Sequence, residues 1–227
     1  MGDNMIPHVN LVIATPGHSM MASYVMSLIK TAQVLNEKRI SWTFVNRYSS
    51  NVADAREVTL SNSMDNDVTM SKPLNGEVTY DKILWIDSDI AWEPEDVIKL
   101  YESDKDIISG AYYLSSGEVT AYPKLLGPGY NYKDVKNMKD IVEIDSAGFG
   151  FLCIKSGVFE SLSRPWFQQV FVNAVINDKD YVMPIMGEDM SLCVRAKQAG
   201  FKIWFDPSVK VQHHKTVSLD WKGIDNE

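Results

Sequence analysis

The sequence predicts an α/β fold in which helices cover both faces of a central, mostly parallel sheet. Short, continuous apolar runs alternate along the chain with segments of helical period. The runs also lack the polar alternation of a sheet that has one face in water. A chain of this kind folds most economically as successive strand–helix–strand units on one sheet.

The first of these units opens the chain. We predict a short apolar strand at 9–14, closed by Thr15-Pro16-Gly17, and a second strand at 41–45. Between them, apolar residues recur at helical spacing over 21–35, so we expect an amphipathic helix whose apolar stripe packs against the sheet. The stripe consists of Met21, Val25, Leu28, Ile29, Ala32 and Leu35.

The middle of the chain continues the alternation. The pattern predicts a helix over 53–64, a strand at 83–86 and another strand at 107–113. A helix between the last two begins at Glu93-Pro94-Glu95-Asp96, because a proline and acidic residues in the first turn suit a helix N-terminus.

The next part of the chain has weaker signals. The segment 114–140, rich in Gly, Pro, Tyr and Lys, predicts loops or a peripheral hairpin, which would suit a flexible flap near a site. A strand-like run follows at 142–154 and contains Gly148-Phe149-Gly150. Glycines inside a strand indicate either the close approach of a backbone or ligand, or a bulge or tight packing.

The last part begins with Gly187-Glu188-Asp189, which opens a predicted helix ending at Gly200. The two acids either cap this helix or take part in chemistry, and capping and chemistry are compatible. Final strands are expected at 201–205 and, after Asp206-Pro207, in a short run ending at Val211.

The most informative motif is the pair Asp87 and Asp89, which directly follows the predicted strand at 83–86. Because that strand is apolar, the carboxylates are expected at its carboxyl end, the edge where open α/β sheets bind ligands. Two Asp oxygens there can hold a hard divalent cation that in turn holds phosphate. Further Asp-x-Asp triplets lie among polar residues and are interpreted as solvated turns: Asp65 and Asp67, Asp104 and Asp106, and Asp178 and Asp180.

Two of the four histidines, His213 and His214, are adjacent after the last predicted strand. Imidazole is a common ligand of borderline metals such as Mn. Adjacent side chains of an extended segment point to opposite faces, so at most one of the two should reach a metal held by Asp87 and Asp89.

Composition limits the classes of function. A chain of 227 residues with 45% hydrophobic and 23% charged residues is expected to form one globular domain over 1–227. The net charge of −8 argues against a nucleic-acid surface. No apolar stretch reaches the about 18 residues of a membrane span and no targeting signal is seen, so a soluble, cytoplasmic protein is expected. Cys153 and Cys193 lack metal-ligand spacing and are expected to be reduced and buried.

Several common enzyme signatures are missing from the sequence. The glycine fingerprint of dinucleotide-binding domains and the phosphate loop of ATPases do not occur, which disfavours a Rossmann dehydrogenase or a P-loop ATPase. The nucleophile elbow of serine hydrolases does not occur either.

The order of the motifs resembles the GT-A glycosyltransferases, most closely their small family 2-like members. The resemblance covers nearly the whole chain. It rests on Thr15-Pro16 after the first strand, Asp87-Ser88-Asp89 after another, the segment Ser146-Ala147-Gly148-Phe149-Gly150, Gly187-Glu188-Asp189 opening a helix with Arg195, and Phe205-Asp206-Pro207 before a terminal His.

This resemblance implies the GT-A fold, with a nucleotide-sugar-binding half at 1–113 and an acceptor-side half at 114–227. It implies transfer of a sugar from a nucleoside-diphosphate sugar (UDP- or GDP-sugar) to a glycan, glycoprotein or small-molecule acceptor. Mn²⁺ or Mg²⁺ would bridge the diphosphate to the Asp-x-Asp motif.

The resemblance also implies roles for single residues. Asp89 would bind the metal directly, Asp87 would contact ribose or metal, and His213 would complete the metal shell. In inverting members the residue corresponding to Asp189 is the general base, and Glu188 would support it. The donor would be bound by Thr15, Pro16, Asn46, Arg56, Asp87, Ser88 and Gly148.

Departures from the family pattern leave alternatives open. Many relatives have an acidic residue after the second strand that reads the nucleotide base, whereas Val45-Asn46-Arg47-Tyr48 stands here, so the base is not fixed. The Gln-x-x-Arg-Trp motif of processive synthases is missing, so we infer transfer of single sugars. Inversion depends on Asp189 acting as a base, because retaining members share the metal motif. A sugar-phosphate nucleotidyltransferase and a non-catalytic nucleotide-sugar-binding module are the other classes considered.

Four tryptophans, Trp85, Trp92, Trp166 and Trp204, could stack on sugar rings. For Trp85 and Trp204, whose neighbours form strands, core packing is the better interpretation.

Overall fold

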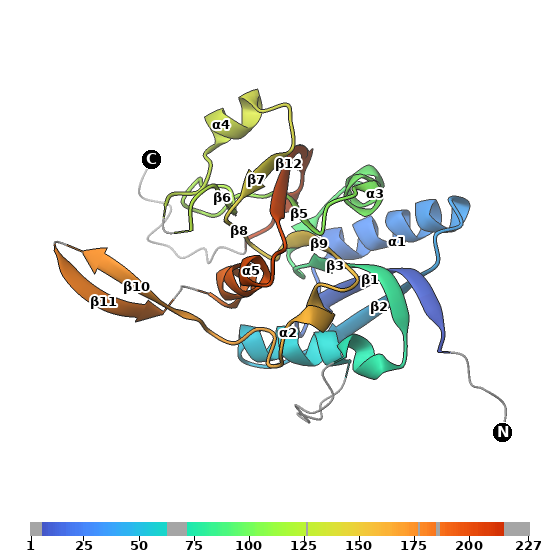
Figure 1. Ribbon diagram of the computed structural model, residues 1–227. Helices are drawn as coiled ribbons and strands as arrows, with labels where there is room; N and C mark the ends of the chain where they lie inside the picture. The colour runs from blue at the N-terminus through green and yellow to red at the C-terminus, as the bar shows by residue number, and fades with distance from the viewer. Residues whose placement is uncertain (1–5, 63–71, 126, 177, 185–186, 216–227) are drawn as a thin grey trace, which may run out of the picture.

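The computed structural model describes residues 6–62, 72–125, 127–176, 178–184 and 187–215. Its centre is a seven-stranded sheet with the strand order β2-β1-β3-β9-β5-β12-β7 (Figure 1). The strands at 9–14, 41–45, 83–86 and 107–113 are confirmed, the last ending at Ala111. The bounds of the sheet strands are β1 His8–Pro16, β2 Trp42–Arg47, β3 Thr79–Ile86, β5 Ile107–Ala111, β7 Val142–Ile144, β9 Phe151–Lys155 and β12 Ile203–Lys210.

The sheet is mostly parallel, as predicted. β1 pairs in parallel with both β2 and β3, and β5 pairs in parallel with β12. β9 lies antiparallel between β3 and β5, and β7 is the antiparallel partner of β12 at the edge. Neighbouring residues on the central strands, such as Ile83, Leu84 and Trp85, are all buried, which explains why these runs show no polar alternation.

Helices cover both faces of the sheet, as predicted (Figure 1). Helices α1 (Ala22–Glu37) and α3 (Pro94–Glu102) contribute to the core on one face, and α2 (Val52–Ser61) and α5 (Glu188–Gln198) to the core on the other. The start of α3 follows the sequence signal, because the Asp96 carboxylate accepts a hydrogen bond from the Glu93 amide at 3.2 Å. The helix expected at 53–64 is described as far as residue 62.

The prediction for the buried face of α1 is confirmed for Leu35 but was wrong for Val25 and Ile29. Val25 and Ile29 of the apolar stripe expose 41% and 50% of their surface. Trp92 provides the reason: its indole N–H donates to the Thr31 hydroxyl at 2.8 Å, and the Ser27 hydroxyl donates to its carbonyl at 2.7 Å. Hydroxyl groups that find such partners can be buried at little cost. The buried side chains of α1 are Tyr24, Ser27, Thr31 and Leu35.

The region after β5 also departs from the prediction. The run at 142–154 is not one strand but forms β7, β8 (Ser146–Ala147) and β9, with the chain turning at Gly148-Phe149-Gly150. The segment 114–140 contains a short strand, β6 (Ala121–Tyr122), that pairs with β8, and a helix, α4 (Tyr132–Asn137), that the sequence analysis missed.

A two-stranded antiparallel hairpin, β10 (Phe171–Ile176) and β11 (Lys179–Pro184), projects from the body of the molecule (Figure 1). Asp178 is exposed in its turn and Asp104 is exposed in the loop after α3, as predicted for solvated triplets. Asp180 instead belongs to β11, and Asp65 and Asp67 lie outside the described residues.

The two strands predicted near the end form one strand, β12, whose pairing with β5 is irregular between Phe205 and Lys210. The short strand β13 (Gln212–His213) follows and pairs antiparallel with β4 (Ile90–Ala91). Two 3₁₀ helices, η1 (Pro73–Gly76) and η2 (Phe159–Ser161), complete the described elements.

Two other expectations concern the whole chain. Cys153 and Cys193 are free and buried, as predicted, and burial raises the pKa of each thiol to about 12. None of the helices in the described segments has the length and apolar composition needed to cross a membrane.

Candidate active site

Three parallel strands, β1, β2 and β3, end at one edge of the sheet, and most of the predicted donor residues lie there. Thr15 and Pro16 end β1, Asn46 precedes the last residue of β2, and Asp87 directly follows β3. The Asn46 side-chain amide donates to the carbonyl groups of Thr15 at 2.7 Å and Gly17 at 3.0 Å. Asn46 therefore holds the ends of β1 and β2 together.

Arg56 on α2 joins the two acidic motifs of the sequence. Its Nη2 donates to Asp87 Oδ1 at 3.0 Å, and its Nε donates to Glu188 Oε1 at 2.9 Å. The Arg56 side chain is only 4% exposed and the Glu188 side chain 12%. Because Asp87 follows β3 and Glu188 begins α5, this one guanidinium fixes the start of α5 against the carboxyl edge of the sheet.

The surroundings of Arg56 keep it charged. Its guanidinium carbon lies 5.7 Å from the centre of the Trp85 ring and 5.3 Å from that of Phe149. Burial alone would lower the pKa of Arg56, but the charges of Asp87 and Glu188 outweigh this effect and raise it. Arg56 Nη1 is buried without a hydrogen-bond partner in the described structure, so its two N–H groups remain unused.

Asp189 is the acid whose ionisation is most perturbed toward neutral pH. Burial raises its pKa to about 6, and the neighbouring Glu188 charge acts in the same direction. The Met190 amide, which donates to Asp189 Oδ1 at 2.7 Å, and the charge of Arg56 oppose this rise. A carboxylate with this pKa is ionised at pH 7 and can accept a proton, as a general base must.

Asp89 lies against the segment that follows β12. β13 pairs with β4 so that His213 lies opposite Ile90, and the His214 amide donates to the Asp89 carbonyl at 2.8 Å. His213 Nε2 is 3.2 Å from Asp89 Oδ2, and Lys215 Nζ is 2.9 Å from the same oxygen. His213 and Lys215 are two residues apart on an extended segment and therefore share a face.

The donor set fits a divalent cation that also binds a substrate. His213 Nδ1 lies 2.6 Å from the Tyr113 carbonyl, so this nitrogen carries the proton and Nε2 is left to face Asp89. His213 Nε2 and Asp89 Oδ2 lie 3.2 Å apart, close enough for both atoms to bind one ion. In the described segments no cluster of three or more His, Cys, Asp or Glu could hold a metal. An ion here would therefore need further ligands from substrate or water.

Comparison with solved structures decides the fold. The catalytic domain of Drosophila beta1,4galactosyltransferase 7, in complex with xylobiose, matches with a TM-score of 0.50 at 13% sequence identity, over 96% of this chain and 79% of that chain. The chain has the GT-A fold.

Other GT-A comparisons are weaker. A197 from STIV matches at 17% identity and a TM-score of 0.48, over 94% of this chain and 98% of that one. A structure of GalNAc-T7 with UDP, GalNAc and Mn²⁺ matches at 11% identity and a TM-score of 0.48, over 96% of this chain and 45% of that one. No protein-family model and no curated protein matches the chain.

Several residues predicted to bind the sugar donor at this edge of the sheet instead contact other parts of the protein. Thr15 is fully buried and its hydroxyl pairs with the Tyr24 hydroxyl. Ser88 is partly buried beside Gly17, where a Cβ would lie 3.1 Å from the Ser88 hydroxyl oxygen. Pro16 is buried at the end of β1. Their roles toward a donor stay predictions.

The glycines at 148 and 150 make room for Tyr112. A Cβ on Gly150 would lie 2.6 Å from Tyr112 Cζ, and a Cβ on Gly148 would collide with the Tyr112 hydroxyl. That hydroxyl accepts a hydrogen bond from the Gly150 amide at 2.9 Å, and the Tyr112 ring meets the His213 ring edge-on at 5.4 Å. Of the two interpretations of these glycines, tight packing therefore describes what they contact, and the Tyr112 ring that they admit lies against His213.

The sequence analysis missed a set of hydrogen bonds that connects α2 and α5 through the loop 163–167. Glu57, next to Arg56, accepts hydrogen bonds from Arg164 Nε at 2.7 Å and from the amides of Trp166 and Phe167 at 2.9 and 3.3 Å. Arg195 on α5 donates to carbonyl groups of the same loop, including those at 165 and 166, both at 2.6 Å. The loop 163–167 therefore fixes the spacing of the helices that carry Arg56 and Glu188.

Sugar stacking is excluded for most of the predicted tryptophans. Trp85 and Trp166 have no exposed surface and Trp92 exposes 4%, so none of these rings can be reached by a sugar in this structure. Among these three, core packing was the preferred interpretation for Trp85, so the stacking prediction was wrong for Trp92 and Trp166. Trp204 is partly buried between the ammonium groups of Lys105 and Lys202, 4.6 and 5.8 Å from its ring centre.

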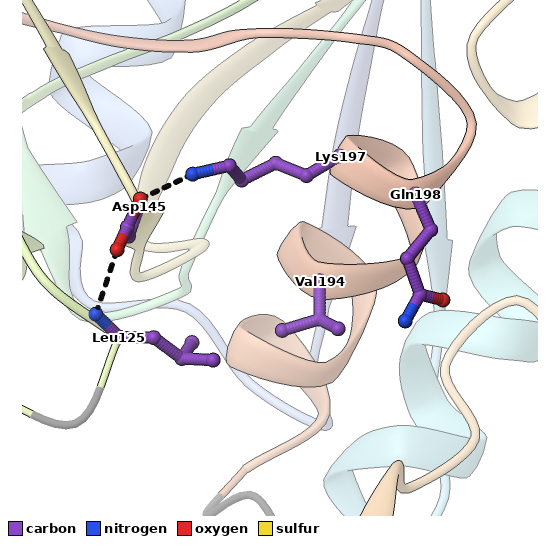
Figure 2. A pocket seen from close by; sticks show the side chains of 5 residues that line it. All are labelled: Leu125, Asp145, Val194, Lys197 and Gln198. Atoms are coloured by element: carbon purple, nitrogen blue, oxygen red, sulfur yellow. Dashed lines mark hydrogen bonds and ion pairs between the residues drawn. The ribbon is translucent and has the colours of Figure 1, made fainter. Parts of the chain in front are cut away.

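Two hollows lie along α5. One, of about 290 Å³, adjoins Glu188 and is lined by Asn51, Val52, Ala53, Phe167, Gln169, Gly187 and Glu188. The other, also about 290 Å³, lies at the far end of the helix, where Lys197 pairs with Asp145 and Asp145 accepts from the Leu125 amide (Figure 2). At 1.5 Å per residue, Lys197 is roughly 12 Å along the helix from Asp189. Only the first hollow borders the acidic site.

Proposed function

We propose that the chain is a metal-dependent glycosyltransferase that moves a single sugar from a nucleoside-diphosphate sugar to an acceptor hydroxyl with inversion. The observation that carries the proposal is the meeting of two acidic motifs at one edge of a GT-A sheet. Arg56 bonds to both Asp87 and Glu188, and the neighbouring Asp189 has a pKa raised to about 6 by burial.

In this proposal Asp189 is the base. Its carboxylate takes the proton of the acceptor hydroxyl while the acceptor oxygen bonds to the anomeric carbon, and the bond from that carbon to the diphosphate breaks. Glu188 accepts a hydrogen bond from Arg56, and the charge of Glu188 adds to the burial that raises the pKa of Asp189. The hollow lined by Glu188, the residue that precedes the base in the chain, offers room for a substrate group.

Asp89 and His213 are the residues proposed to hold Mn²⁺ or Mg²⁺. A bound divalent ion would neutralise the charge that builds on the leaving nucleoside diphosphate. Asp87, which Arg56 already engages, is proposed to contact the ribose or the same ion through its free oxygen. Thr15, Asn46 and Ser88 are proposed to shape the donor site through the strand ends that they hold.

The donor is proposed to be a UDP- or GDP-sugar, and the acceptor a glycan, a glycoprotein or a small molecule. Support for the reaction class comes from this chain's own residues together with a fold that the Drosophila galactosyltransferase also uses. A nucleotidyltransferase or a non-catalytic module would differ in outcome: the first would consume a sugar phosphate and a nucleoside triphosphate, and the second would bind without turnover.

A thermal-shift panel tests the donor site without knowledge of the acceptor. Nucleoside diphosphates and nucleotide sugars are added with Mn²⁺, and the series is repeated with chelator. A ligand at 100 times its dissociation constant stabilises the native state by about 2.7 kcal/mol. We expect one nucleotide family to raise the melting temperature only with Mn²⁺, and Asp89→Ala to lose this response while Asp104→Ala keeps it. The absence of a shift with every nucleotide would refute the proposal.

A further inference from the structure

Lys215 contacts the candidate site, but neither the sequence motifs nor the fold gives it a role there. Its ammonium lies 2.9 Å from Asp89 Oδ2, the oxygen that His213 also faces. The ammonium therefore lies beside Asp89 where the divalent cation is proposed to bind. The ion pair is open to solvent, since the Lys215 side chain is 54% exposed and that of Asp89 32%. Ion pairs this exposed are weak and easily exchanged.

Backbone hydrogen bonds of the neighbouring residues fix the position of Lys215 in the chain relative to Asp89. The pairing of β13 with β4 and the hydrogen bond from the His214 amide to the Asp89 carbonyl set the register of 212–215 against 89–91. Because alternate residues of an extended segment share a face, Lys215 points to the same side as His213. Any ligand that approaches Asp89 and His213 therefore meets the Lys215 ammonium.

Two other cations near this edge, among the described residues, already have partners. Arg56 is buried and bonds to Asp87 and Glu188, and Arg47 donates to the Asn46 carbonyl at 2.8 Å. The edge is otherwise acidic, in a chain of net charge −8, so an incoming diphosphate needs positive charge at the point of contact. Lys215 can supply this charge with a flexible stem and three donors.

We propose that Lys215 is a diphosphate-binding residue of the donor site, with its ammonium paired to Asp89 until a divalent cation takes that carboxylate and then turned to the phosphate oxygens. This inference rests on the proposed function. Lys215 would place a positive charge beside the leaving diphosphate in addition to that of the divalent cation. No bond is made or broken by Lys215, which acts by charge and hydrogen bonding alone.

The test uses the variant Lys215→Met, with Lys210→Met as a matched control that removes one exposed lysine from β12. Lys215→Arg keeps the charge. The probes are Mn²⁺ alone, followed by the electron paramagnetic resonance of the free ion, and UDP or GDP at saturating Mn²⁺, followed by calorimetry. Uridine and guanosine, which have no phosphate, are measured beside them.

Lys215→Met is expected to move the two affinities in opposite directions. Mn²⁺ alone should bind about two- to fivefold more tightly, because Asp89 loses its competing ammonium. UDP or GDP should bind about tenfold more weakly, because a charge-assisted hydrogen bond to phosphate is lost. Lys215→Arg should stay within about threefold of the wild type for the diphosphate, and the nucleosides should not respond to any variant.

The inference is overturned if Lys215→Met matches Lys210→Met in both measurements, or if the diphosphate binds more tightly after the change. The failure of the proposed function would look different. In that case the wild-type protein itself would bind neither UDP nor GDP with Mn²⁺, and the role of Lys215 toward phosphate would fall with it.

Discussion

The substitution Asp189→Asn should stabilise the protein, and the gain should depend on pH. Burial raises the pKa of Asp189 to about 6 from an ordinary value of 3.8. Above pH 6 the native state carries this charge at a cost, whereas below pH 4 the group is neutral in both the native and the unfolded state. Its unfavourable contribution therefore appears as the pH rises from about 4 to about 6.

The size of the effect follows from the pKa difference. A difference of about 2, at 1.36 kcal/mol for each unit, corresponds to about 3 kcal/mol. For a chain of this length that equals a gain of about 6 to 12 °C in Tm at pH 8. Asparagine can still accept the hydrogen bond from the Met190 amide, so this contact in the first turn of α5 is retained.

Urea unfolding followed by tryptophan fluorescence would measure this difference at pH 4 and at pH 8. The stability of Asp189→Asn relative to wild type should rise by about 3 kcal/mol between the two. Asp104→Asn, at an exposed carboxylate, should show no such rise, because Lys105 lowers rather than raises the pKa of Asp104. A stability difference for Asp189→Asn that is the same at both pH values would show that the charge of Asp189 does not destabilise the native state.

Three further substitutions test the proposed metal site and the contacts that surround the candidate site. Asp89→Ala should remove the Mn²⁺-dependent stabilisation by nucleotide, about 2.7 kcal/mol at 100 times the dissociation constant, and a retained melting-temperature shift would contradict its role. Gly150→Ala should cost about 1 to 3 kcal/mol in urea unfolding, because its Cβ would lie 2.6 Å from Tyr112 Cζ; unchanged stability would mean that the ring moves freely. Glu57→Gln should lower the free energy of unfolding by about 3 kcal/mol, since it removes the charge that pairs with buried Arg164. Unfolding at the same urea concentration as wild type would show that the loop 163–167 does not depend on this charge.

The sequence predicts the carboxyl edge of the sheet well for a physical reason. A strand buried on both faces leaves an uninterrupted apolar run, so the first polar residues after it, Asp87 and Asp89, must lie at its end. Strand alternation likewise limits the two adjacent histidines to one that can face Asp89, and His213 is the one that does.

The contacts that complete the site depend on packing that no local pattern records. Arg56 and Glu188 are 132 positions apart, and they meet only because α2 and α5 cover the same face of the sheet. Periodicity also failed on α1, where buried hydroxyls pair with Trp92 and leave Val25 and Ile29 exposed. Lys215 carried no motif, and its place follows from the pairing of β13 with β4.

In the proposed reaction, Asp189 deprotonates the acceptor that attacks a sugar donor bound at Asp89. Release of nucleoside diphosphate from UDP- and GDP-sugars with Mn²⁺, with water as the acceptor, tests this claim most directly. We predict that wild type hydrolyses one nucleotide family, that Asp89→Ala does not, and that Asp189→Asn still binds the donor but hydrolyses it about 100-fold or more slowly. Hydrolysis by Asp189→Asn at the wild-type rate would contradict the proposed role of Asp189 as the base. Wild-type protein that leaves every nucleotide sugar intact would contradict the proposed reaction.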